Sequence, residues 1–408
     1  MMYKETEGGV TAAKGFRASG IHCGIRHNKE KKDIALIYCE KPAVCAGLFT
    51  LNKVKAAPVK LDMETVKNET VRAIFANSGI ANACAPGCDE AAAGMQKMAA
   101  DALGIKPEEV LVSSTGVIGI PLDLVPMQKG LPELVKELTD APSGSDDAAH
   151  AIMTTDTRKK EYAIQFELGG KTVTIGAISK GSGMIHPHMG TMLCYITTDC
   201  AIRKAMLKKA LKEVCDVTFN RISVDGDTST NDSLIMLADG LAGNPAIDTE
   251  NEDFEIFVKA LKHLCTVMAK RMAADGEGAR HLITCTVSHA ADEAEAELLS
   301  KSVISSTLTK AAIFGCDANW GRVLCAMGYS GADFAPSTVD IRFASRAGEI
   351  LVCEKGNGLS FDEDLAAKIL HEDEVQILID MHEGNSSVTC WGCDITYDYI
   401  RINGDYRT

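Results

Sequence analysis

The feature that most constrains the fold is the pairing of neighbouring strand patterns into hairpins. Residues 163–179, AIQFELGGKTVTIGAIS, alternate between apolar and polar side chains around Gly169-Gly170, a dipeptide that suits a two-residue hairpin turn. A second hairpin pattern spans residues 339–352. Consecutive strands of a parallel sheet need a longer crossover connection, usually a helix. The hairpins therefore favour sheets that are largely antiparallel over a doubly wound parallel sheet.

Amphipathic helical patterns lie between the strands in both halves of the chain. Apolar residues recur at helical spacing over residues 89–103, 202–217, 253–273 and 293–312. Gly104 stands where a helix commonly ends in a left-handed residue. No internal repeat and no long linker separates two independent domains. The sequence predicts an α/β fold, a layered sandwich with mixed, largely antiparallel sheets.

Two local features give narrower predictions. Residues 32–40 alternate and residues 43–51 form a continuous apolar run, which predicts two strands near the N-terminus. The polar stretch 140–150 predicts the start of a helix, with Ser145 as its N-cap.

The charge and the apolar pattern exclude two classes of partner. The formal net charge is −14 and no run of five basic residues occurs, so the chain repels phosphate backbones and no nucleic-acid partner is expected. No apolar run is long enough to span a bilayer, so no membrane partner is expected. The start, MMYKETEGGV, lacks the apolar core of a signal peptide, and a cytoplasmic location is expected.

The fifteen cysteines are scattered and odd in number, which predicts free thiols rather than a disulfide framework. The closest pairs are Cys84/Cys88 and Cys390/Cys393, and neither has nearby the second short pair or the paired histidine motif that a structural zinc site requires. The segment 223–233, SVDGDTSTNDS, is as rich in carboxylates as a calcium loop but lacks the glutamate at position twelve. No metal is expected, and this segment is predicted to be a hydrogen-bonded loop near the site.

The dipeptide Gly190-Thr191 suggests a nucleophile. A threonine whose α-amine becomes free carries its own base, because an α-amino group titrates at about pH 7.7–8. Such enzymes are made as precursors and cleave themselves before the threonine, and a small preceding residue eases the strained geometry. The ordinary alternative is a β-branched residue that opens a strand, here 192–196.

Four further features are weak alone. Lys180 precedes two glycines in KGSGM and could pair with a substrate carboxylate, although most loop lysines are merely solvated. Thr115-Gly116 ends a strand pattern and could supply a hydroxyl and a backbone N–H to an oxyanion, or form only a tight turn. Glu277 stands between glycines, where a carboxylate could meet a substrate ammonium. The polar tail 403–408 could contact substrate or simply fray.

Together these segments resemble the ornithine acetyltransferase family, the glutamate N-acetyltransferases of arginine biosynthesis. The resemblance runs from end to end and is carried by nine segments in order: GGVTAAKGFRASG, NSGIANAC, VSSTGVIG, AIMTTDT, KGSGMIHPHMGTML, SVDGDTSTND, DGEGA, AIFGCDANWGR and WGCDITYDYIRINGDYRT. It implies a sandwich fold of its own class and self-cleavage between Gly190 and Thr191. The products would be an α chain (1–190) and a β chain (191–408), assembled as α2β2.

The resemblance also implies roles for individual residues. Thr191 would be the nucleophile, and Thr115 and Gly116 would form the oxyanion hole. The implied substrate contacts are Thr154, Lys180, Thr191, Glu277, Asn403 and Thr408, with Thr155 as an alternative to Thr154. The implied reaction moves an acetyl group from N2-acetylornithine to glutamate through an acetyl-threonine intermediate. No cofactor is expected, and the sequence leaves open whether acetyl-CoA is a second donor.

Four positions depart from the residues that are most frequent in that family: Ile80, His188, Gly190 and Ala318 stand where Asn, Asn, Ala and Pro are usual. None of them is the nucleophile or an oxyanion donor.

Two rival functions differ from acetyl transfer to glutamate. An N-terminal-nucleophile amidohydrolase or aminopeptidase would pass the acyl group from Thr191 to water, and a non-enzymatic binding protein would leave the chain uncut.

Overall fold

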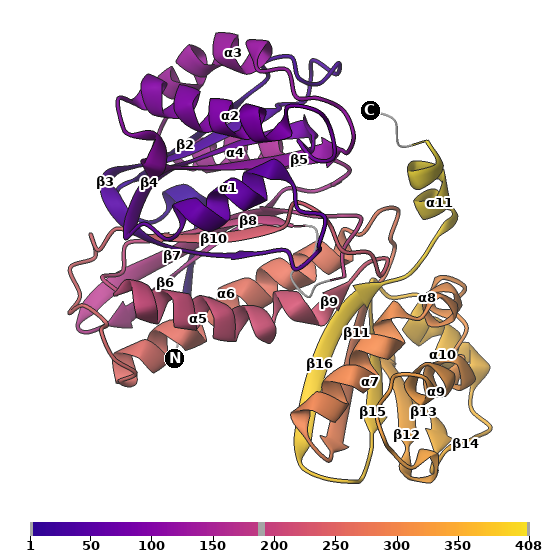
Figure 1. Cartoon of the computed structure of the whole chain (residues 1–408). Coiled ribbons are helices and arrows are strands. Elements are labelled where there is room, and N and C mark those ends of the chain that lie inside the picture. The colour runs from indigo at the N-terminus through magenta and orange to yellow at the C-terminus, as the bar shows by residue number, and fades with distance from the viewer. Residues whose placement is uncertain (1–2, 187–191, 406–408) are drawn as a thin grey trace.

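The computed structural model describes residues 3–186 and 192–405, which form two β-sheets flanked by helices (Figure 1). The larger sheet has nine strands in the order β1-β6-β7-β8-β10-β3-β4-β5, and β2 pairs with β3 outside this path. Its parallel pairs are β8–β10 and β4–β5. The strands are β1 (Lys4–Thr6), β2 (Phe16–Ile21), β3 (Ile34–Phe49), β4 (Thr70–Ile80), β5 (Val110–Val117), β6 (Lys160–Leu168), β7 (Lys171–Lys180), β8 (Leu193–Thr198) and β10 (Ser233–Ala238).

The long strand β3 belongs to both halves of this sheet. Residues 34–38 pair with both β2 and β4, whereas residues 44–49 pair with β10. A register shift between Tyr38 and Ala43 separates the two parts. The prediction of two strands here was wrong, because one strand runs through both segments and joins the two halves of the sheet.

Helices cover both outer faces of this sheet and also fill the space between its halves. The helices α2 (Cys88–Leu103) and α3 (Val125–Lys136) pack on one face of β3, β4 and β5. The helix α4 (Pro142–Ile152) packs on the opposite face, in a core that also contains side chains of β8 and β10. The helices α5 (Lys204–Asp216) and α6 (Glu252–Ala274) cover the other face of β6, β7, β8 and β10. Figure 1 shows the resulting layers, with α2 and α3 on one outside and α5 and α6 on the other.

The smaller sheet has seven strands in the order β14-β13-β12-β15-β11-β16-β9. Its strands are β9 (Ile222–Ser223), β11 (Leu282–Ala290), β12 (Asp340–Ser345), β13 (Gly348–Glu354), β14 (Asn357–Gly358), β15 (Glu374–Asp380) and β16 (Ser386–Cys393). The helices α7 (Glu293–Ser305), α8 (Thr307–Phe314), α9 (Trp320–Gly328) and α10 (Glu363–Leu370) contribute to its core. The helix α1 (Ala57–Thr65) lies beside β5, and α11 (Tyr397–Gly404) projects from the body with no buried residue (Figure 1).

The predicted fold class is confirmed: the chain is α/β, and most strand pairs in both sheets are antiparallel. The hairpin of β6 and β7 is confirmed, with Gly169 and Gly170 at positive φ in its turn. The hairpin of β12 and β13 is confirmed too. The helix ending at Gly104 is confirmed, with φ 66° at that residue.

Two helix predictions were wrong in detail. The segment 293–312 contains two helices, because the Ser306 side chain accepts a hydrogen bond from the Thr309 N–H and starts α8. Ser145 is not an N-cap but lies inside α4, whose N-cap is Ala141. Its hydroxyl instead accepts a hydrogen bond of 3.1 Å from the Val10 N–H, a contact that sequence spacing does not reveal.

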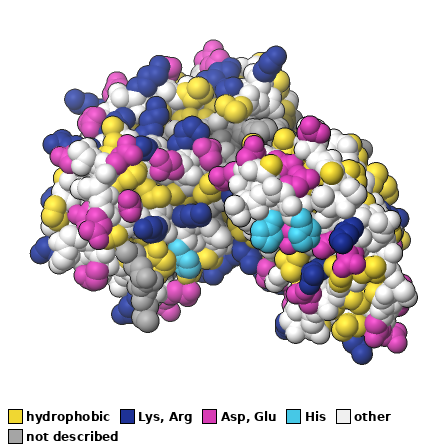
Figure 2. Space-filling model, turned by 90° about the horizontal axis from the view of Figure 1, so that it is seen from below, with side chains coloured by type: hydrophobic (Ala, Val, Ile, Leu, Met, Phe, Trp, Pro, Cys, Tyr) yellow, Lys and Arg dark blue, Asp and Glu magenta, His cyan; other side chains and the backbone are white. Residues whose placement is uncertain are grey.

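All fifteen cysteines are free, as predicted. Within the described residues, no group of three or more His, Cys, Asp and Glu side chains could hold a metal ion. No helix in the same part of the chain has the length and apolar character of a membrane span. On the face shown in Figure 2, basic and acidic side chains are interspersed.

A histidine at one end of the smaller sheet makes stability depend on pH. The His382 ring lies between two carboxylates, with Nε2 2.9 Å from Asp340 and Nδ1 3.4 Å from Asp380. The hydrogen bond with Asp340, followed by the charges of both carboxylates, raises the pKa of His382 despite the opposing effects of burial and Lys355. The charged ring therefore favours the folded state.

We expect His382→Gln to melt at a lower temperature than the parent protein in acid but not in alkaline solution. A group with a raised pKa stabilises the fold fully below its unfolded pKa, about 6.5 for His, and this contribution is lost as pH rises through the folded pKa. Melting curves from pH 5.5 to 9 measure the difference. His371→Gln is the control, because that ring pairs with the backbone carbonyl of Ala367. A constant difference over this pH range would contradict the prediction.

Candidate active site

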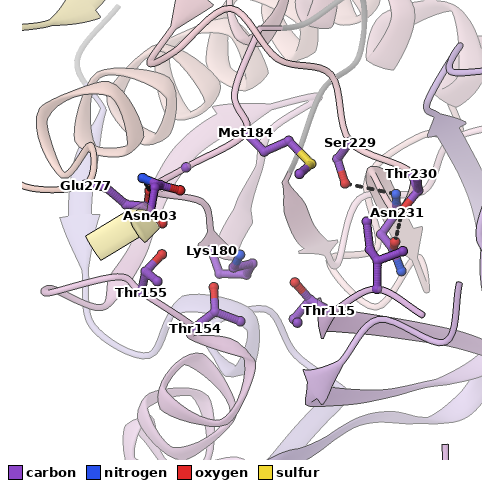
Figure 3. A pocket seen from close by; sticks show the side chains of 13 residues that line it. Thr115, Thr154, Thr155, Lys180, Met184, Ser229, Thr230, Asn231, Glu277 and Asn403 are labelled. Atoms are coloured by element: carbon purple, nitrogen blue, oxygen red, sulfur yellow. Dashed lines mark hydrogen bonds between the residues drawn. The ribbon is translucent and has the colours of Figure 1, made fainter. Parts of the chain in front are cut away.

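A pocket at the ends of β5 and β7 gathers residues that are far apart in the sequence (Figure 3). It is lined by Thr115, Gly116, Ile118, Thr154, Thr155, Lys180, Gly183, Met184, Ser229, Thr230, Asn231, Glu277 and Asn403. Six of these residues are among the predicted site residues: Thr115, Gly116, Thr154, Lys180, Glu277 and Asn403. Thr155, the alternative to Thr154, also lines the pocket.

Lys180 is the buried cation of this pocket. It is the last residue of β7 and is 3% exposed, and its side chain has no hydrogen-bond or ion-pair partner among residues 3–186 and 192–405. Burial lowers the pKa of the Lys180 ammonium, the charges of Lys160 and Arg26 add to this effect, and the carboxylates of Asp156 and Glu277 oppose it. A buried cation without a bonded partner is stabilised by an anionic ligand, which makes this end of the pocket suitable for a carboxylate.

Glu277 and Asn403 lie together at another side of the pocket (Figure 3). The Glu277 carboxylate is almost buried and accepts a hydrogen bond of 2.7 Å from the Asn403 side chain. Its backbone N–H donates to the Ser182 carbonyl at 2.9 Å. Gly183 makes room for this carboxylate, since a Cβ there would lie 2.4 Å from its Oε2. The fixed carboxylate gives the pocket a negative end that suits an ammonium group.

Thr115 and Gly116 lie near the end of β5, where they are paired with Ser78 and Gly79 of β4. Gly116 has φ +132°, and a Cβ at this position would lie 2.2 Å from the carbonyl carbon of Gly79 on β4. Only glycine fits this close approach. The Thr115 hydroxyl points into the pocket (Figure 3), so a hydroxyl and a neighbouring N–H can face an oxygen bound there.

A buried ion-pair cluster supports the loops around the pocket. The Lys160 ammonium lies 2.7 Å from Asp156 and 2.6 Å from Asp275, and all three side chains are at most 5% exposed. Asp156 accepts hydrogen bonds from the N–H groups of Thr154 and Gly181, at 3.0 and 2.7 Å. The cluster thus fixes the backbone beside Thr154 and the backbone that follows Lys180.

Asp275 of this cluster also holds Thr157 and Ser182 in place. Its carboxylate accepts hydrogen bonds from the N–H and hydroxyl of Thr157, and its carbonyl accepts one of 2.7 Å from the Ser182 hydroxyl.

The charge of Asp156 is stabilised by its neighbours. Burial by itself would raise the pKa of Asp156, but the charges of Lys160 and Lys180 and a hydrogen bond from Lys160 outweigh this effect and lower that pKa. Asp156 is therefore ionised at neutral pH.

Comparison with known proteins identifies the family. A model of the ArgJ family matches residues 17–408. The chain belongs to the ArgJ family. It is 50% identical to the arginine biosynthesis bifunctional protein ArgJ 1 of Clostridium acetobutylicum, over 98% of this chain and 97% of the relative. It is 49% identical to the arginine biosynthesis bifunctional protein ArgJ of Caldanaerobacter subterraneus subsp. tengcongensis, over 98% and 99%. A crystal structure of the arginine biosynthesis bifunctional protein ArgJ from Bacillus halodurans is 44% identical, with a TM-score of 0.50, and covers 52% of this chain and 98% of its own.

In this ArgJ-family chain, three predicted site residues lie outside the described residues: Gly190, Thr191 and Thr408. His188, one of the four departures from the family's usual residues, lies outside them too. The described strands that precede and follow the segment of His188, Gly190 and Thr191 in the sequence are β7 and β8. Lys180 of β7 and Leu193 of β8 are direct partners in neighbouring antiparallel strands. The Met192 N–H, which belongs to the peptide bond after residue 191, donates to Asp232 at 2.8 Å.

Sequence reasoning missed several residues of this ArgJ-family site. Asp156 and Asp275 stand within quoted motifs, but nothing in the sequence indicated that Lys160 would join them. Ser229, Thr230 and Asn231 were assigned only to a hydrogen-bonded loop, and the structure places them on the pocket wall.

The loop 223–233 is hydrogen-bonded, as predicted. Asp225 accepts bonds from the N–H groups of Met184 and Ile185, at 2.6 and 2.9 Å. Of the four departures from the family's usual residues, Ile80 ends β4 opposite Val117, and Ala318 is buried just before α9.

We expect Lys160→Met to lower the free energy of unfolding by about 3–5 kcal/mol, because two buried carboxylates would lose their shared cation. Lys159→Met is the matched control, since this adjacent lysine pairs with Asp146 and Glu161 at the surface and should contribute less than about 1 kcal/mol. Chemical denaturation of the three proteins measures the difference. Equal stabilities of the two variants would refute this role of Lys160.

Proposed function

We propose that this chain is an acetyltransferase that moves the acetyl group of N2-acetylornithine to glutamate by a ping-pong reaction. The observation that carries the proposal is the pocket itself, in which the buried Lys180 cation, the Glu277 carboxylate and the Thr115-Gly116 end of β5 line one space. Relatives at 49–50% identity over nearly the whole chain bear the name arginine biosynthesis bifunctional protein. Family and pocket chemistry thus support the same reaction.

In the proposed first half-reaction, the Thr191 hydroxyl oxygen attacks the acetyl carbonyl carbon while the α-amine of Thr191 takes the hydroxyl proton. The resulting oxyanion accepts hydrogen bonds from the Thr115 hydroxyl and the Gly116 N–H. These donors lower the barrier because they are fixed before charge develops on the oxygen. The C–N bond then breaks, the proton passes from the Thr191 amine to the leaving amine, and ornithine departs from acetyl-Thr191.

In the second half-reaction, the α-amine of glutamate attacks the same acetyl carbon, and the steps run in reverse order. Lys180 pairs with a substrate carboxylate, and Glu277, held by Asn403, serves the ammonium end of ornithine. Thr154 and the terminal Thr408 complete the substrate contacts. One pocket can receive both substrates because they share an α-amino-acid head.

The nucleophile requires self-cleavage between Gly190 and Thr191, which would give chains 1–190 and 191–408. The second would contain 218 of the 408 residues, about 53%, and the solved Bacillus halodurans chain covers 52% of this chain while being itself 98% covered. The cut would not separate the two chains, because β7 and β8 pair from Ile175 and Thr198 to Lys180 and Leu193.

We also propose an α2β2 assembly, supported by the exposed side chains of Tyr397 and Ile400 on α11. We propose a cytoplasmic location, supported by the free thiols.

The first test is whether turnover depends on the acceptor. We expect the purified protein to release ornithine from N2-acetylornithine rapidly with glutamate and, after one turnover, only slowly without it. Equally fast release without glutamate would show that water is the acceptor and would favour the amidohydrolase. The same assay with acetyl-CoA and glutamate tests the second donor.

The second test concerns the nucleophile. We expect intact-mass measurement and N-terminal sequencing of the parent protein to give two chains, the second beginning Thr-Met-Leu-Cys-Tyr. Thr191→Ala should give one uncut, inactive chain, because both cleavage and acetyl transfer use the same hydroxyl. A Thr191→Ala protein that still cleaves and transfers acetyl groups would refute the assignment of Thr191.

A further inference from the structure

We propose that Asn231 is a positioning residue that holds the oxyanion-binding end of β5 in place, and that Asp232 fixes this end relative to the strand of the nucleophile. The inference deepens the proposed function and rests on it. Neither residue is among those predicted to bind substrate or to react.

Asn231 bridges the ends of two strands. Its side-chain NH2 group donates to the carbonyl of Ala81, just after β4, at 2.6 Å and to the carbonyl of Ser114, on β5, at 2.8 Å. The residue is 6% exposed and lines the pocket (Figure 3). Since β5 is the last strand of the sheet, β4 supports it on one side only. Asn231 adds a second support directly before Thr115.

The orientation of this amide group is itself determined. The Thr230 hydroxyl donates to the Asn231 side-chain oxygen at 2.5 Å, and the Asn231 N–H donates to the Ser229 hydroxyl at 3.0 Å (Figure 3). With the oxygen occupied as an acceptor, the NH2 group must face the two carbonyls. Three consecutive residues therefore present a fixed pair of donors to the end of β5.

Asp232 connects the same segment to Met192, just before β8. Its carboxylate accepts a bond of 2.8 Å from the Met192 N–H, and Met192 directly follows the proposed nucleophile. The Ser233 N–H donates to the Met192 carbonyl at 2.9 Å, and Asp232 is 1% exposed. Because Asn231 and Asp232 are consecutive, one short segment sets the distance between the oxyanion donors and the start of β8.

This distance is relevant to the rate rather than to substrate affinity. The charged ends of the substrate are served by Lys180 and Glu277, whereas the hydrogen bonds of the Asn231 side chain go to Ala81, Ser114 and Thr230. The oxyanion forms only as the reaction proceeds, so a displaced donor weakens binding of the transition state and leaves the ground state nearly unchanged. A displacement of about 1 Å can lower a rate by about a hundredfold.

We expect Asn231→Ala and Asn231→Asp to lower kcat by about ten- to a hundredfold and to change KM for N2-acetylornithine by less than about threefold. The aspartate variant keeps the side-chain volume but has no N–H to donate, so it separates lost hydrogen bonds from a cavity. Intact mass confirms that the assayed protein is cleaved. Unchanged kcat in either variant, or a loss confined to KM, overturns the inference.

Asn244→Ala is the matched control. Asn244 is also 6% exposed and also donates to two carbonyls, those of Ala201 and Pro245, but it is not a lining residue of the pocket. We expect its loss to lower stability and to leave kcat within about twofold of the parent value. An equal fall of kcat in both variants would mean a general structural effect and would overturn the inference.

Hydrogen exchange separates failure of this inference from failure of the proposed function. We expect amides of residues 112–118 to exchange at least tenfold faster in Asn231→Ala than in the parent and unchanged in Asn244→Ala. This readout needs no activity: unchanged exchange at 112–118 overturns the inference even if the parent transfers acetyl groups. A parent protein that transfers no acetyl group to glutamate instead removes the proposed function, and with it the catalytic role assigned to Asn231.

Discussion

The pocket depends on one buried ion-pair cluster, Lys160 between Asp156 and Asp275. A single buried charge costs several kcal/mol, so the three side chains persist only together and hydrogen-bonded to the backbone. Those backbone bonds reach the loop of Thr154 and the residues that follow Lys180. The cluster therefore orders the pocket wall without taking part in the proposed reaction, and Lys180, which lines the pocket, lies outside the cluster's ion pairs.

The sequence predicted the class of fold and the local elements that depend on near neighbours. Alternation around Gly169-Gly170 and the glycine at 104 act through adjacent residues, and both predictions were confirmed. Predictions failed where a distant partner decides the structure. Ser145 binds Val10 instead of capping a helix, and β3 continues past residue 40 because β10 pairs with its second half.

In the candidate site, too, the sequence predicted features that depend on adjacent residues and missed those that depend on distant partners. Thr115, Lys180 and Glu277 stood out because glycines beside them mark close backbone approach, and the structure places all three around one pocket. Lys160 and Asn231 could not be recognised from the sequence as residues that support the site, because their hydrogen-bond partners lie up to 150 residues away. A lysine in TRKKEY and an asparagine in a polar loop look solvated until the fold buries them.

The architecture also explains why cleavage in mid-chain is compatible with a single stable site. The proposed cut lies in the connection between β7 and β8, which remain joined by their own backbone hydrogen bonds. Thr115 and Lys180 would come from the first chain, whereas Asn231, Glu277 and Asn403 would come from the second. The Asn231 bonds to Ala81 and Ser114 would then cross between chains, at the place where the oxyanion donors meet the strand of the nucleophile. The geometry of the reaction would thus depend on contacts that the fold forms before the chain is cut.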